Sequence, residues 1–213
     1  MKKYHSFLML LLCSFTVLSL SSCLDDDDDS SDYYTNLTSA QKVTLLYNSA
    51  GSYSGKIYYP ADDNSTIADS VDTYLAMSPS IASSDTCEAI SMTFPLETLN
   101  KYVGNDSTVL QEAGSAQLTA NAYIYTTQLK DYINQSFYSL YFKPDDLTVT
   151  SGDNTISISF VTDSQLSFIG NYYGPYLYIL NYSEVEAYLL VKNITINNYT
   201  YDIERPFIIH VTK

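Results

Sequence analysis

Thr155-Ile156-Ser157-Ile158-Ser159-Phe160 is the most regular stretch of the sequence. Apolar residues take every second position and alternate with serine or threonine, which is the period of a β-strand. The pattern indicates a sheet with one face on a core and one face in water, as antiparallel sheets commonly have. Asp153-Asn154, just before it, is a hairpin-type turn signal, although the favoured glycine does not follow it, and this strand is expected to belong to a run of short antiparallel strands.

Similar stretches occur along most of the chain. Tyr53 to Tyr59 alternates in the same way and is followed by a turn, 60–64, that is rich in aspartate and asparagine. The other candidate strands are Ala68–Met77, Glu88–Phe94, Gln117–Thr127, Phe137–Phe142, Leu147–Thr150, Tyr176–Leu180, Val185–Asn193 and Phe207–Val211. About nine or ten short strands predict a mainly β fold, an antiparallel sandwich or barrel, with the strand order left open.

Two short helices interrupt the strands. Thr38 is a candidate N-cap with Gln41 as its capping-box partner, and Gly51 is a candidate stop. Pro95 and Gly104 bracket a second short helix with an apolar stripe. The fold prediction is therefore mainly β with two helices, at the border of the α+β class.

The stretch after the first predicted helix, Gly51-Ser52-Tyr53-Ser54-Gly55, resembles the glycine-x-aromatic opening of lipocalin-like barrels. Tyr53 stands where that family usually has tryptophan. The resemblance implies a closed barrel that carries a small apolar ligand, and this is one alternative for the function.

The N-terminus has the plan of a secretory signal peptide. Met1-Lys2-Lys3 is followed by an apolar segment from Phe7 to Leu20 and then by Ser21 and Ser22. At about 1.5 Å per residue a helix of this length falls short of the roughly 30 Å hydrocarbon core of a bilayer. Residues 1–22 are therefore predicted to be a cleaved leader.

Leu20-Ser21-Ser22-Cys23 resembles a bacterial lipobox, which implies cleavage before Cys23 and a lipid on its thiol. The next residues form an acidic run similar to the export signal of Bacteroides-type surface lipoproteins: Asp25, Asp26, Asp27, Asp28 and Asp29. The resemblance implies an outer-membrane lipoprotein that faces the cell exterior. Residues 23–37 are predicted to be an acidic, Ser/Asp-rich tether, and residues 38–213 a single domain.

The formal net charge of −14 argues against some partners. Nucleic acids are bound through lysine and arginine that neutralise phosphates, so a strongly acidic chain is not expected to bind them. The membrane is expected to be contacted through the lipid anchor alone.

No catalytic, metal or cofactor motif is visible. Cys87 is the one cysteine left after the leader and the lipidation site, and it is interpreted as a small buried hydrophobe. His210 has no histidine or cysteine nearby in sequence and is interpreted as a partly exposed strand residue. Glu184 and Glu186 share one strand face, which keeps an unrecognised hydrolase among the alternatives. The leading expectation is a protein that is not an enzyme and needs no cofactor.

Tyrosine is the anomaly of the composition, with 22 tyrosines and no tryptophan. Tyr172, Tyr173 and Tyr176 surround Gly174-Pro175, where a turn could present their rings to a ligand. The competing interpretation is packing within the sheet, which is also expected for Tyr123, Tyr125, Tyr138 and Tyr141.

These observations predict a non-catalytic surface binding module, with a glycan as the favoured ligand. The alternatives are a structural, adhesin-like or accessory subunit of a cell-surface complex, the lipocalin-like carrier and the hydrolase. Asp69-Ser70-Val71 and Asp106-Ser107-Thr108 also resemble the O-glycosylation sequence of Bacteroidetes exported proteins, and modification at Ser70 or Ser107 is left open.

Overall fold

The computed structural model describes residues 33–60, 68–81, 86–162, 167–169 and 172–213, without the side chains of 68, 86, 167–169 and 172–174. The chain divides into two units, Met1–Tyr33 and Tyr34–Lys213. The predicted leader, Cys23 and the run Asp25–Asp29 lie outside the described residues. The fold given below is that of the second unit.

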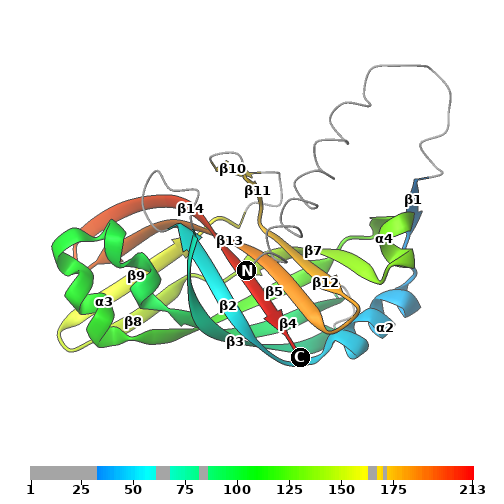
Figure 1. Ribbon diagram of the computed structural model, residues 1–213, viewed down its shortest axis with the longest axis horizontal. Helices are drawn as coiled ribbons and strands as arrows, with labels where there is room; N and C mark the ends of the chain where they lie inside the picture. Colours follow the sequence, from blue (N-terminus) through cyan, green and yellow to red (C-terminus); the bar gives the residue numbers. More distant parts are fainter. Residues whose placement is uncertain (1–32, 61–67, 82–85, 163–166, 170–171) are drawn as a thin grey trace, which may run out of the picture. The chain divides into compact units, whose positions relative to one another are not determined.

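The second unit is built on a closed, eight-stranded antiparallel β-barrel (Figure 1). Its strands are, in order around the wall, β2 (Gly51–Pro60), β3 (Ala68–Ile81), β4 (Thr86–Pro95), β5 (Ser115–Ile124), β7 (Phe137–Pro144), β12 (Tyr176–Leu180), β13 (Glu184–Ile196) and β14 (Tyr199–Thr212). Strand β14 returns to pair with β2, and this pairing closes the ring. The predicted antiparallel β fold is confirmed, in its barrel form.

Gly55 lies at the seam where the first and last barrel strands meet. It stands opposite Val211 in the register of β2 and β14. A Cβ atom on residue 55 would come within 2.2 Å of the carbonyl oxygen of His210 and 2.8 Å of the Cα of Val211. Only glycine allows the two backbones to approach this closely.

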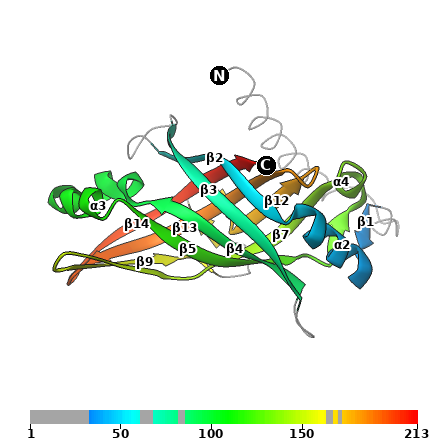
Figure 2. The same cartoon turned by 90° about the horizontal axis from the view of Figure 1, so that it is seen from below.

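Strand β13 belongs to the barrel along one half and to a sheet extension along the other (Figure 2). Glu184 to Ala187 pairs with β12, whereas Val191 to Ile196 pairs with β9 (Asn154–Phe160). A register shift between Val191 and Asn193 lies at the start of the half that pairs with β9. Strand β8 (Leu147–Ser151) then pairs with β9, so the regular stretch 155–160 lies in the extension.

Two small sheets flank the barrel. Strands β1 (Tyr34–Asn36) and β6 (Thr127–Leu129) form one of them, and β10 (Ser167–Ile169) and β11 (Tyr172–Gly174) form the other. Strand β1 lies within the residues predicted to be tether, so regular structure begins before residue 38. The β10–β11 pair lies beside β13 and β14 (Figure 1).

The first predicted helix is present as α2 (Ser39–Ser49), capped by Thr38 and Gln41 as expected. The second is a 3₁₀-helix, η2 (Leu96–Tyr102), and is followed by η3 (Gly104–Asp106) and α3 (Ser107–Ala113), which the sequence did not predict. The single turn α4 (Lys130–Asn134) is too short to show a period. None of the described helices has the length and apolar composition of a bilayer-spanning segment.

One apolar core fills the barrel and continues into the extension. Alternate residues of each wall strand point inward, for example Leu177 and Ile179 of β12 and Ile209 and Val211 of β14, all fully buried. The largest side chains at its centre make aromatic contacts: Phe94 lies 6.1 Å from both Phe160 and Phe207, centroid to centroid. Side chains therefore occupy the space inside the wall, as in other small barrels.

Candidate functional site

The predicted Gly174-Pro175 turn joins β11 to β12. Tyr172 and Tyr173 lie on β11 next to β10, and their side chains lie outside the described residues. Tyr176 begins β12, and its half-buried side chain is on the outer side of the barrel wall because Leu177 and Ile179 point inward. Of the three tyrosines singled out by the sequence, Tyr176 is thus the one that the structure places.

Tyr176 belongs to an outer aromatic cluster that the sequence did not reveal. Its ring stacks beside that of Tyr178, with centroids 6.1 Å apart and planes at 26°, and lies 6.1 Å from Tyr125. Tyr178 in turn meets Tyr188 edge to face at 6.2 Å. These are favoured geometries for aromatic pairs. We refer to the four residues Tyr125, Tyr176, Tyr178 and Tyr188 as the tyrosine cluster.

Further rings extend the tyrosine cluster over neighbouring elements. Phe137 of β7 lies 5.2 Å from Tyr178 and 4.7 Å from Tyr132 of α4. Tyr141 pairs with Tyr176 across the strands and stacks on Tyr123 at 6.3 Å. The outer surface of β5, β7, β12 and β13 therefore carries a nearly continuous aromatic layer.

The four tyrosines that were expected to pack within the sheet do so, one on the inner side of the wall and three on the outer side. Tyr138 does point into the barrel and is 8% exposed, but Tyr123, Tyr125 and Tyr141 are half-buried on the outer side. The alternation of the strands predicts the side on which each tyrosine lies. Ala122 and Ile124 take the inward positions of β5, so the odd-numbered tyrosines lie outside.

Two hydroxyl groups of the tyrosine cluster, those of Tyr125 and Tyr178, stay protonated over the physiological range. Burial, and next the proximity of Tyr176, raise the pKa of Tyr125 to about 12. The same two causes, with Glu186 also nearby, raise the pKa of Tyr178 well above its usual value. The half-buried Tyr125 keeps a hydroxyl that donates and accepts hydrogen bonds, whereas Tyr178 is 6% exposed and lies at the base of the cluster.

Charged residues continue the layer across the next strands. Glu186 lies between Tyr178 and His210 in the registers of β12, β13 and β14, and beyond His210 come Lys56 of β2 and Asp72 of β3. The Nζ atom of Lys56 lies 2.8 Å from Asp72 Oδ1. This ion pair is largely exposed and so contributes little to stability. We call Glu184, Glu186, His210, Lys56 and Asp72 the charged row.

Glu184 and Glu186 share the outer face of β13, which agrees with the strand pattern, and both interact with neighbours that the sequence did not suggest. The Oε1 atom of Glu184 lies 2.7 Å from Nε2 of His210, which is partly exposed as expected. Glu186 is 3% exposed and accepts a hydrogen bond of 2.8 Å from the Tyr188 hydroxyl. Burial raises the pKa of Glu186, against the opposing effects of the Tyr188 bond and of His210. The hydrolase alternative rests on these groups.

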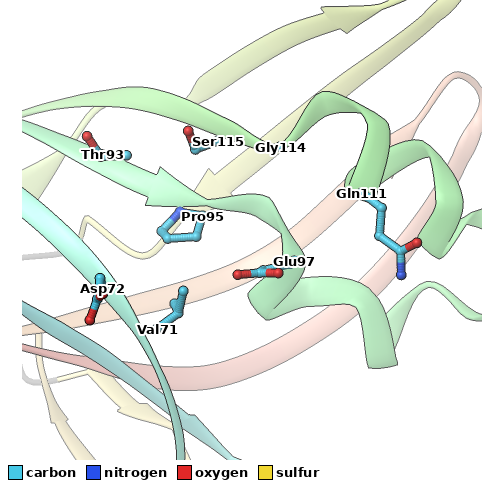
Figure 3. A pocket seen from close by; sticks show the side chains of 8 residues that line it. All are labelled: Val71, Asp72, Thr93, Pro95, Glu97, Gln111, Gly114 and Ser115. Carbon is cyan, nitrogen blue, oxygen red and sulfur yellow. The ribbon is translucent and has the colours of Figure 1, made fainter.

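Two shallow hollows lie on the outer wall, away from the tyrosine cluster. The first lies between β3, the end of β4 and α3, and is lined by Val71, Asp72, Thr93, Pro95, Glu97, Gln111, Gly114 and Ser115 (Figure 3). The second lies over β3, β4 and β5 and is lined mainly by alanine, serine and threonine. Asp72 belongs to both the first hollow and the charged row, so polar groups continue from one into the other.

The structure also places Cys87 and Ser70, which the sequence singled out, outside the tyrosine cluster and the charged row. Cys87 is buried, as expected, with its Sγ 3.8 Å from Asn121 Oδ1. Ser70 is exposed on β3. Across the described ranges, no three histidine, cysteine or carboxylate residues come together as a metal site would require.

In comparisons with known proteins, no family model, no curated protein and no solved structure matches this chain.

Proposed function

We propose that this protein is a lipid-anchored module of the outer cell surface that binds a glycan, without catalysis, through the tyrosine cluster. The observation that carries the proposal is the set of ring contacts among Tyr125, Tyr176, Tyr178 and Tyr188 on the outer side of the barrel. Sugar rings present apolar C–H faces edged with hydroxyls. Tyrosines offer matching faces and hydroxyls, and the neighbouring carboxylates add hydrogen-bond acceptors.

The first test is binding of the intact protein to a panel of plant, host and microbial polysaccharides, with the Tyr176→Ala variant alongside. Tyr176 lies between Tyr125 and Tyr178, so its removal breaks the aromatic layer. We expect the affinity to fall about tenfold or more, which corresponds to a loss of about 1.4 kcal/mol. Isothermal titration calorimetry or affinity electrophoresis would measure it.

Tyr199→Ala is the matched control, because Tyr199 is 72% exposed and lies on the β13–β14 hairpin outside the tyrosine cluster. Its affinity should equal that of the wild type. Equal loss in both variants, or no loss in Tyr176→Ala, would remove the tyrosine cluster from the proposal. A folded protein that binds no polysaccharide but crosslinks to one surface protein would support the accessory or adhesin-like role, and release of a cleaved product would support the hydrolase.

The carrier alternative needs a ligand-sized space inside the barrel. Buried side chains fill the interior, and the two hollows described above lie outside the wall. The packed interior therefore favours the tyrosine cluster over the carrier alternative as the basis of the proposal.

The location is proposed from the sequence, because Cys23 and the acidic run lie outside the described residues. Two or three acyl chains hold a protein to a bilayer far more firmly than one, since each buried methylene contributes about 0.8 kcal/mol. We expect a palmitate analogue to label the wild-type protein and to leave Cys23→Ala unlabelled. Cys13→Ala is the control and should stay labelled, because Cys13 lies in the leader. An unlabelled wild type would contradict the anchor, and protection from protease on intact cells would contradict surface exposure.

A further inference from the structure

Helix α2 lies at one end of the barrel (Figures 1 and 2). It packs against β3 and β4 and buries Leu45, Leu46 and Ser49. Its start is held by Leu37, whose N–H donates to the carbonyl oxygen of Thr126, and its last turn leads through Ala50 directly into β2. The contacts of that last turn therefore decide how firmly this end of the barrel is covered.

The last turn of α2 rests on a buried carboxyl group, that of Glu88. This residue shares the inward face of β4 with Ile90 and Met92 and is 0% exposed. Its Oε1 atom lies 2.8 Å from the hydroxyl oxygen of Ser49. Its Oε2 atom is buried and has no hydrogen-bond partner among the described residues. An ionised carboxylate in this position would be poorly compensated.

The hydrogen bonds around Ser49 change with the protonation state of Glu88. The Ser49 hydroxyl has one proton, but it lies 2.8 Å from the carbonyl oxygen of Leu45 and 2.8 Å from Glu88 Oε1. A protonated Glu88 donates to the Ser49 oxygen, which leaves the serine proton for Leu45. An ionised Glu88 can only accept a hydrogen bond. The Ser49 hydroxyl then donates to the carboxylate, and its bond to the Leu45 carbonyl oxygen is lost.

Two other titratable groups face this carboxyl. The Tyr53 hydroxyl of β2 donates to the carbonyl oxygen of Ser49, and burial, with Glu88 nearby, raises the pKa of Tyr53 so that it stays neutral. Lys213, after β14, donates to the carbonyl oxygen of Asn48 at 2.8 Å, and its charge favours ionisation of Glu88. Burial outweighs the Ser49 bond and Lys213, and the pKa of Glu88 is raised to about 7.

We propose that Glu88 and Ser49 form a proton-operated latch that holds α2 over the end of the barrel when Glu88 is neutral and releases it when Glu88 ionises. When α2 is open, Glu88 meets water and returns to its ordinary pKa of 4.5. The closed state therefore binds the proton more tightly. Closure is most stable below pH 4.5, weakens as the pH rises towards 7, and is weakest above that.

Hydrogen exchange of the intact protein between pH 5 and 8.5, corrected for the intrinsic rate at each pH, tests the latch. We expect the protection of α2 amides, such as that of Ala50 bonded to the Leu46 carbonyl, to fall tenfold or more relative to amides of β13 and β14. In Glu88→Gln the amide cannot ionise, and α2 should keep the same protection throughout. Glu112→Gln, an exposed change on α3, should behave like the wild type.

Ser49→Ala keeps the test decisive even where Glu88→Gln fails to fold. This change removes the hydrogen bond that stabilises the ionised carboxylate, so the pKa of Glu88 should rise and the loss of α2 protection should move to higher pH. The latch is refuted if wild-type α2 is equally protected at pH 5 and 8.5, or if Glu88→Gln shows the same loss as the wild type.

Discussion

Replacing Phe207 with alanine is expected to lower the free energy of unfolding by about 3–5 kcal/mol. Phe207 is fully buried on β14, with its ring 6.1 Å from Phe94 and 6.3 Å from Tyr59. These rings lie where the barrel closes, so the lost side chain leaves a cavity that the rigid wall cannot collapse to fill. The loss is a large fraction of the roughly 5–15 kcal/mol that stabilises an ordinary domain. Urea denaturation followed by circular dichroism would measure it.

Tyr47→Ala is the control for this change. Tyr47 is an aromatic residue of α2 that is 63% exposed, and alanine favours a helix, so its stability should stay within about 0.5 kcal/mol of the wild type. A loss below about 1 kcal/mol in Phe207→Ala would show that the core at this point is loosely packed, against the structure described here.

The second large effect is expected from Gly55→Ala, although it adds only a methyl group. The new Cβ would lie 2.2 Å from the carbonyl oxygen of His210, and a backbone atom cannot move aside as the end of a side chain can. Relief requires β2 and β14 to separate where they close the barrel. We expect a loss of about 3 kcal/mol or more, at the upper end of what overpacking costs. Thermal and urea unfolding would show it.

Ser54→Ala provides the neighbouring control, because Ser54 is exposed on the outer side of β2. It should unfold at nearly the wild-type denaturant concentration. If Gly55→Ala were equally stable, the two strands would not be as close as the structure has them, and the explanation for glycine at the seam would be wrong.

The strand pattern predicted the elements of the fold well where it was regular. Ile156, Ile158 and Phe160 are buried in β9, and Ile90, Met92 and Phe94 are buried in β4, as their alternation indicated. The capping box of Thr38 and Gln41 is also present. Each of these signals is local, because neighbouring residues alone set the side of a strand or the start of a helix. The one helix expected after Pro95 was described less well, because η2 and η3 are 3₁₀ turns without a helical period of 3.6.

The candidate site was only partly visible in the sequence. Tyr176 stood out beside a glycine and a proline, but its partner Tyr125 follows β5 and lies about fifty residues away in the chain. The same holds for Glu88 and Ser49, which are 39 residues apart. Alternation indicates that Glu88 points inward with Ile90, but it cannot identify the helix that covers it.

The sequence by itself determined that most of the chain forms short antiparallel strands, which residues of those strands face a core, and where the first helix begins. Its resemblance to an exported lipoprotein remains a prediction for residues outside the described structure. Only the tertiary structure decided that the strands close into a barrel. Closure depends on the register between β2 and β14, which are far apart in the sequence of the domain but adjacent in the sheet. It likewise decided that β13 serves two partners and that the tyrosines meet outside the wall. Such pairings depend on geometry summed over many residues, whereas the alternation within one strand is the same whichever strand lies beside it.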